Sequence, residues 1–250
     1  MSQRGPQPTS QSGLFVIEPT MPEGFLYRDD VITVEEEQAL IERFKELPFK
    51  PFEFHGFLGN RRVVSFGWRY DFSSAVLQPS NPIPPFLSSL RERAAVFANV
   101  PSDTLQQVLI NEYAPGAGIG WHRDKAMFED VIAISLRASC TLRLRREQGG
   151  GWERATQTVH PRSAYLLRGP VRREWEHSVP PVDRLRYSVT FRNFIAGNMA
   201  RTRFNVHAAT CCAHARQCRG EPARPPHGPT WRPPRSAMLC SRTTAGGRPG

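Results

Sequence analysis

The stretch QVLINEYAPGAGIGWHRDKAMFEDVIAISL, residues 107–136, combines two apolar runs with a turn-rich polar segment between them. The runs at 107–113 and 131–136 are rich in Val, Ile and Leu and have the length of strands. His122 and Asp124 lie two residues apart between the two runs. Alternate residues of an extended segment point the same way, so we expect both side chains to face one site.

Short β-type runs continue from this stretch to residue 194, and turn residues separate them. Many short strands in series predict a sandwich, a barrel or a jelly roll. The expected strands, in chain order, are QQVLINEY, VIAISL, CTLRLRR, ATQTVH, SAYLLRG, REWEHSV and LRYSVTFRNF.

The first hundred residues are helical in character. The segment 33–47 predicts a helix, because Thr33 and Glu36 form a capping box and the apolar residues after them fall on one face. A second helix is expected within 84–100, and LFVIEP at 14–19 is compatible with a short strand. The fold class is therefore expected to be mainly β with flanking N-terminal helices, an α+β chain.

The sequence predicts one domain with two tails. Residues 1–13 are polar and rich in Ser, Gln and Pro, which indicates disorder. We expect a folded domain over 14–194 and a disordered Arg- and Pro-rich extension over 195–250. The extension is either functional or the product of GC-rich DNA translated past a stop codon. Its segment CCAHARQC, 211–218, lacks the paired spacing of a zinc site.

The net charge of +10 is concentrated in the extension. Residues 195–250 carry nine arginines and one acid, whereas residues 1–194 carry 24 basic and 22 acidic groups. The nearly neutral domain therefore says little about its partner. The odd number of cysteines and the lack of a secretory leader or a membrane-spanning run predict a cytoplasmic protein with no membrane association, which we expect to be a monomer.

His122 and Asp124 need a third ligand to hold a metal ion. Non-haem iron(II) oxygenases use two histidines and one carboxylate on one face of the metal and leave the other face open. His177 is the best third ligand by position, because it lies in an expected strand of the β half. The other histidines lie elsewhere: His55 in an aromatic segment, His160 before a proline, and His207, His214 and His227 in the extension.

Two arginines in the last expected strand, Arg186 and Arg192, are six residues apart and so share one face. Arginines that point inward are costly unless each meets an anion. A dicarboxylate such as 2-oxoglutarate supplies two anions, and guanidinium binds each in a bidentate fork. Taken singly, each of these histidines could be an ordinary residue at the end of a strand, and each arginine could be solvated. Their occurrence together, in this order and at these spacings, favours a metal and cosubstrate site.

The order of these residues, together with NEYAPG before the H-x-D motif and RYSVTFR at the end, resembles the AlkB family of iron(II) and 2-oxoglutarate-dependent dioxygenases. The resemblance covers about residues 20–194 and implies a double-stranded β-helix, or jelly roll. It implies Fe(II) as the metal, with 2-oxoglutarate and O2 as cosubstrates. The implied iron ligands are His122, Asp124 and His177, and the implied cosubstrate residues are Asn111, Tyr113, Arg186 and Arg192.

The substrate is less well determined by the resemblance. Family members that repair bases often have a second acid two residues after the iron aspartate, but here that position is Ala126. Glu129 or Asp130 could take the place of this second acid, or the segment FED at 128–130 could be a solvated loop without a role in the site. The segment around 52–72 falls where the family builds its lid, and its candidate substrate residues are Phe54, His55, Phe57, Arg61 and Arg62, with the two arginines facing phosphate. Phe66, Trp68 and Tyr70 are expected on one buried strand face.

Three functions remain open at this point. The first is oxidative demethylation of N-alkylated bases in DNA or RNA, with release of formaldehyde. The second is an oxygenase that acts on a protein side chain or a small metabolite. The third is a jelly-roll binding module without turnover, which the complete set of ligands and arginines disfavours.

Overall fold

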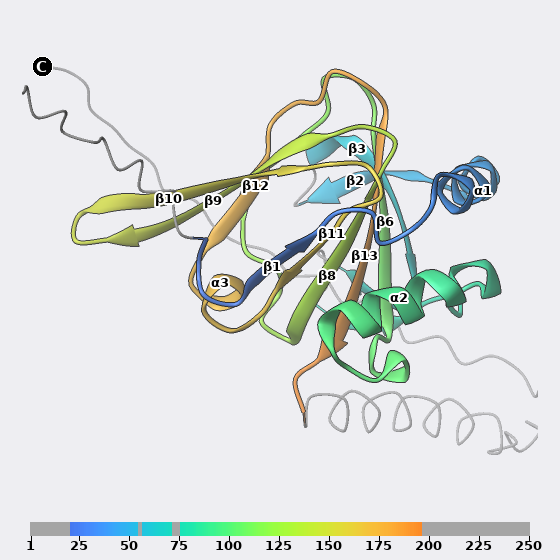
Figure 1. Cartoon of the computed structure of the whole chain (residues 1–250), viewed down its shortest axis with the longest axis horizontal. Helices are drawn as coiled ribbons and strands as arrows, with labels where there is room; N and C mark the ends of the chain where they lie inside the picture. Colours follow the sequence, from blue (N-terminus) through green and yellow to red (C-terminus); the bar gives the residue numbers. More distant parts are fainter. Residues whose placement is uncertain (1–20, 55–56, 72–75, 197–250) are drawn as a thin grey trace, which may run out of the picture. The chain divides into compact units, whose positions relative to one another are not determined.

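The structure is a computed structural model that describes residues 21–54, 57–71 and 76–196. Within this part of the chain, two antiparallel sheets form the jelly roll that the sequence predicts. The seven-stranded sheet has the order β1-β11-β8-β13-β6-β3-β2, and the four-stranded sheet has the order β10-β9-β12-β7. Figure 1 shows the two helices α1 and α2 on one side of the large sheet and β9, β10 and β12 on its other side.

The seven strands expected from residue 106 onward begin and end close to the expected positions, whereas β1, β5 and β7 lie where no strand was expected. Their bounds are β1 Phe25–Arg28, β2 Lys50–Phe54, β3 Phe57–Phe66, β4 Trp68–Asp71, β5 Val76–Pro79, β6 Gln107–Tyr113, β7 Ile119–His122, β8 Phe128–Leu136, β9 Cys140–Gln148, β10 Gly151–Val159, β11 Ala164–Leu167, β12 Glu176–Val179 and β13 Arg186–Phe194. All seven strands expected after residue 105 are present. One difference is a short helix, α3 Gly169–Arg173, that precedes β12 and shortens it.

Both expected helices are confirmed. Helix α1, Val34–Phe44, begins with the predicted capping box between Thr33 and Glu36. Helix α2, Ser88–Ala98, ends at Asn99, whose left-handed conformation stops the helix. A 3₁₀ turn, η1 Pro85–Leu87, leads into α2, and another, η2 Ser102–Thr104, follows it.

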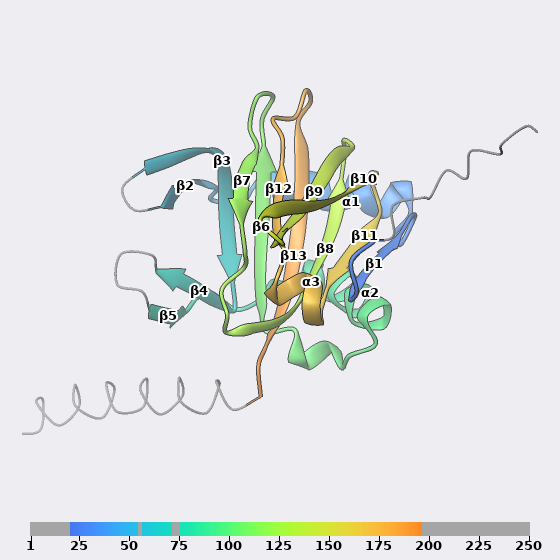
Figure 2. The same ribbon diagram turned by 90° about the vertical axis from the view of Figure 1, so that its left-hand side faces the viewer.

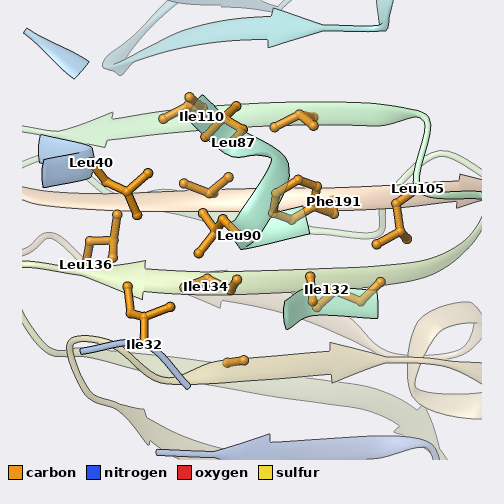
Figure 3. Close-up of a cluster of buried hydrophobic side chains, with 14 of the residues drawn as sticks. Ile32, Leu40, Leu87, Leu90, Leu105, Ile110, Ile132, Ile134, Leu136 and Phe191 are labelled. Atoms are coloured by element: carbon orange, nitrogen blue, oxygen red, sulfur yellow. The ribbon is translucent and has the colours of Figure 1, made fainter. Parts of the chain in front are cut away.

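The helices bury one face of the large sheet. Leu40 of α1 and Leu90 of α2 pack over β6, β8 and β13, as the close-up of this cluster shows (Figure 3). The strand residues that meet them alternate with residues that face the four-stranded sheet. In β13 the odd-numbered residues from Tyr187 to Phe191 belong to the helix-side core, so the even-numbered residues face the space between the sheets.

The prediction that Phe66, Trp68 and Tyr70 share one buried face of a single strand is wrong. Phe66 ends β3 in the core, and Gly67 then takes a φ of +75° that breaks the strand. Trp68 begins β4, which pairs only with β5 and lies to one side of the two main sheets (Figure 2). The Trp68 ring packs edge-on against Phe194 at 6.0 Å between centroids.

Several expectations lie outside the described residues. They are the disordered segment 1–13, the short strand at 14–19, and the extension from residue 197 onward with its cysteine cluster. None of the helices in the described part of the chain has the length and apolar composition needed to cross a bilayer.

Gly67 provides a test of the break between β3 and β4. A Cβ at this position would lie 2.0 Å from the Gln106 carbonyl oxygen, in addition to the cost of the left-handed backbone. Gly116 has a similar φ of +84° but no atom within 4 Å of such a Cβ, so Gly116→Ala should lose only about 1–2 kcal/mol. We expect Gly67→Ala to lower the free energy of unfolding, measured with urea, by at least about 2 kcal/mol more than Gly116→Ala does. Equal losses would contradict the close approach.

Candidate active site

Three side chains converge between the sheets to form a candidate metal centre. His122 ends β7, His177 lies in the neighbouring strand β12, and the two residues are paired across the ladder. Asp124 follows β7 by two residues. One ligand atom of each of the three residues lies within 4.8 Å of the others. This set of two imidazoles and one carboxylate matches the ligands of non-haem iron(II) oxygenases.

Both imidazoles are poised to bind a metal ion. The Nδ1 of His122 lies 2.9 Å from the Gly120 carbonyl oxygen, which can only accept, so Nδ1 carries the proton and Nε2 keeps its lone pair. Burial lowers the pKa of His122 and lowers that of His177 to about 3. Both rings are therefore neutral near pH 7, as metal ligation requires.

Asp124 is held as a carboxylate by Arg192. Burial alone would raise the pKa of Asp124, but the charge of Arg192 lowers it well below the usual range. The Nη2 and Nε of Arg192 donate to the same oxygen, Oδ1, at 2.7 and 3.0 Å. The other oxygen, Oδ2, lies 3.6 Å from the Nε2 of His177, on the side of the candidate metal position.

Arg186 lies in the same space and is 1% exposed. Its Nε and Nη1 have no hydrogen-bond partner in the described part of the chain. The guanidinium lies 5.1 Å from the centre of the Tyr113 ring, and its charge partly offsets the effect of burial, which raises the pKa of Tyr165. A buried guanidinium with unpaired donors is costly, so this position suits a ligand carboxylate.

Asn111 connects the cosubstrate candidates to strand β3. Its Oδ1 accepts a hydrogen bond of 3.2 Å from the Nε of Arg61, and its Nδ2 lies 3.4 Å from the Ser188 hydroxyl oxygen. The strand register places Asn111 opposite Ser188 and Tyr113 opposite Arg186. All four positions are on the face of the large sheet that lies toward β7 and β12.

The structure places the candidate substrate residues differently from one another. Arg61 is only 8% exposed and lies on the site face, and its expected contact with the substrate stays a prediction. Arg62 points to the opposite face, where its Nε donates to Glu112 at 2.7 Å. The hairpin of β2 and β3 is present, but His55 and the side chains of Phe54 and Phe57 lie outside the described residues.

The loop after Asp124 supplies no second acid to the site. Ala126 is exposed, and Glu129 is exposed at the start of β8. Asp130 is buried, but both of its oxygens accept hydrogen bonds of 2.8 Å from Arg168. Asp130 therefore has a structural role, and the contact of the exposed Glu129 with a substrate stays a prediction.

Two residues at the site, Arg172 and Tyr165, were missed by sequence reasoning, and a third, Arg61, was expected in a different place. Arg172 of α3 is 5% exposed and donates to the Lys125 and Phe128 carbonyl oxygens, so it braces the loop that carries Asp124. Tyr165 of β11 is buried near Arg186. Arg61 was placed in the lid, although the alternation of β3 from Phe66 backward would have put it on the site face.

Comparisons with known proteins agree with this geometry. A family model described as the 2OG-Fe(II) oxygenase superfamily matches residues 29–208. The Arabidopsis thaliana protein named "Alkylated DNA repair protein ALKBH8 homolog" is 26% identical over 214 residues, which cover 75% of this chain and 60% of that protein. The Mus musculus protein named "tRNA (carboxymethyluridine(34)-5-O)-methyltransferase ALKBH8" is 29% identical over 169 residues, which cover 64% of this chain and 25% of that protein.

The chain thus spans less than two thirds of the length of these two curated relatives. A solved structure described as OsALKBH1 has the same fold, with a TM-score of 0.54 and 15% identity over 70% of this chain and all of that one. Enzymes of the matched family use Fe(II), 2-oxoglutarate and O2, and the triad described above is able to bind the metal. The chain belongs to the 2OG-Fe(II) oxygenase superfamily and resembles its AlkB-like members.

Proposed function

We propose that this dioxygenase demethylates N-alkylated bases in DNA or RNA, with Fe(II) bound by His122, Asp124 and His177. The observation that carries the proposal is that the structure holds both this triad and a buried Arg186. The unpaired donors of Arg186 suit a carboxylate ligand. When bound, the metal with 2-oxoglutarate and O2 supplies the hydroxylation of a C–H bond, coupled to decarboxylation of the cosubstrate to succinate. Hydroxylation of an N-methyl group gives a hydroxymethyl amine, which releases formaldehyde.

The residues of the chain have separate tasks in this reaction. Arg186 binds the distal carboxylate of 2-oxoglutarate in a buried pocket, with Asn111 and Tyr113 beside it. Arg192 fixes the orientation of Asp124 through Oδ1 and leaves Oδ2 for the metal.

A nucleic-acid substrate is supported by the names of two relatives, which refer to alkylated DNA and to a uridine of tRNA. The alternative is an oxygenase that acts on a protein side chain or a small metabolite. Anaerobic reconstitution with Fe(II) and 2-oxoglutarate, followed by assay of formaldehyde with methylated oligonucleotides, nucleosides and peptides, separates these substrates. Formaldehyde from peptides or free metabolites alone would exclude the proposed function.

The metal ligands can be tested one at a time. His122→Ala, Asp124→Ala and His177→Ala should each reduce succinate formation by more than about 100-fold, because each removes one of three ligands. Asp124→Glu should also fail, since the added methylene displaces the carboxylate by about 1 Å. His160→Ala is the matched control, because His160 is exposed and contacts Ser139 instead. Normal turnover in any ligand variant would refute the assignment.

Arg186→Lys tests the cosubstrate pocket. The change keeps the charge but loses the bidentate fork, which should cost about 2–4 kcal/mol, or roughly a 30- to 1,000-fold weaker affinity for 2-oxoglutarate. Titration of 2-oxoglutarate in the presence of Fe(II), followed by the visible charge-transfer band, measures this affinity. Arg184→Lys, at an exposed position two residues earlier, should leave the affinity unchanged. A change below about threefold for Arg186→Lys would remove that residue from the pocket.

The lowered pKa values of the two histidines predict little proton release on metal binding. Two ordinary imidazoles with a pKa near 6.5 would together release about half a proton at pH 7. Because burial lowers both pKa values here, the rings are already deprotonated at pH 7 and we expect a much smaller release. Calorimetry of Mn(II) binding in buffers with different ionisation enthalpies measures this number. A release of half a proton or more would show that the pKa values are not lowered.

A further inference from the structure

Arg61 is a buried arginine without an acidic partner. Its guanidinium stacks on the Phe52 ring, with Cζ 3.8 Å from the ring centre, and its Nε donates to Asn111. Among the described residues, no carboxylate lies within ion-pair distance of Arg61. Arg61 lies on the face of β3 that is turned toward the metal centre, and its hydrogen bond to Asn111 of the neighbouring strand β6 holds it there. The metal and cosubstrate assignments leave this residue without a role.

The described groups of the pocket carry an excess of positive charge. The buried arginines are Arg61, Arg172, Arg186 and Arg192. With a divalent metal ion they carry six positive charges, whereas Asp124 and the two carboxylates of 2-oxoglutarate carry three negative charges. The other acids nearby do not offset this excess, because Glu112 and Asp130 are bound by Arg62 and Arg168 and Glu129 is exposed.

We propose that Arg61 recognises the substrate and selects a neutral base that presents a carbonyl oxygen, while rejecting cationic N-alkylated bases. The inference rests on the proposed function and specifies its substrate class. Guanidinium has only hydrogen-bond donors, so its partner must be an acceptor such as the carbonyl of a uracil-type base. An N3-alkylated cytosine keeps its C2 carbonyl, but it has an amino donor in place of the C4 carbonyl and carries a positive charge.

The pocket strengthens this discrimination because Arg61 cannot easily move away. Phe52 covers one face of its guanidinium, Asn111 holds its Nε, and only 8% of the residue is exposed. Like charges repel strongly where water is excluded, so a cationic base in this position would be expensive to bind. A neutral base avoids that cost and can accept a hydrogen bond from the guanidinium of Arg61.

A matched pair of substrates tests the inference. The two substrates are 3-methyluridine and 3-methylcytidine, placed at the same position of one single-stranded oligonucleotide. They carry the same methyl group, but the uridine is neutral with a carbonyl at C4, whereas the cytidine is cationic with an amino group there. Formaldehyde release by the full chain with Fe(II) and 2-oxoglutarate should favour 3-methyluridine by at least about 30-fold in kcat/KM, which corresponds to about 2 kcal/mol. Equal rates, or a preference for 3-methylcytidine, would overturn the inference.

Variants of Arg61 identify the residue responsible. Arg61→Met keeps an unbranched apolar side chain next to Phe52 but removes the guanidinium and its charge, and should reduce the preference at least about tenfold. Arg61→Lys keeps a charge and serves if the first variant does not fold; it should retain discrimination against the cation but lose rate with 3-methyluridine. Arg62→Met is the matched control, because Arg62 faces the other side of β3, and it should leave the preference unchanged.

Two further outcomes distinguish the inference from the proposed function. If Arg61→Met weakens 2-oxoglutarate binding equally with both oligonucleotides and leaves their ratio unchanged, Arg61 only positions Asn111, and the inference is wrong while the function stands. If the wild-type protein consumes 2-oxoglutarate but neither oligonucleotide yields formaldehyde, the nucleic-acid function itself fails, and the inference fails with it.

Discussion

The alternation of side chains along β13 is the constraint on which the site depends. Because β13 lies between β6 and β8 in the middle of the large sheet, its register fixes which residues face the helices and which face the metal. Val189 and Phe191 are fully buried beneath the helices, so Arg186 and Arg192 must point into the space between the sheets. A shift of one residue would bury arginines in the apolar core, which makes the register strongly specified.

The sequence was sufficient for the parts of the fold that periodicity and local chemistry determine. The capping box at Thr33 predicted where α1 begins, and the apolar runs after residue 105 predicted the strands. The convergence of His122, Asp124 and His177 followed from spacing and family resemblance, and the structure brings the three together. These predictions succeeded because each rests on residues that are close in sequence or lie on strands of strong character.

The parts that failed depend on contacts that sequence spacing does not contain. Phe66 and Trp68 have the spacing of one strand face, but the close approach of Gly67 to the Gln106 carbonyl turns the chain between them. Arg61 and Arg62 are equally basic, and their own spacing does not show which of them is buried; the place of Phe66 in the helix-side core and the pairing of β3 with β6 put Arg61 on the site face. Arg172 reaches the loop of Asp124 from a short helix that lies between two expected strands and that the sequence did not predict.

Buried charge links the stability of this fold to its chemistry. Arg192 is compensated by Asp124, but Arg186 retains unpaired donors that no described residue of the chain satisfies. A protein normally avoids such a group, since an unsatisfied buried donor costs about 1–3 kcal/mol and a charged one costs more. The fold tolerates this cost because Arg186 is anchored within the central strands, where the surrounding packing fixes it. A bound carboxylate would pair these donors and so offset the free-energy cost of burying them. The binding site is therefore already formed before the cosubstrate binds.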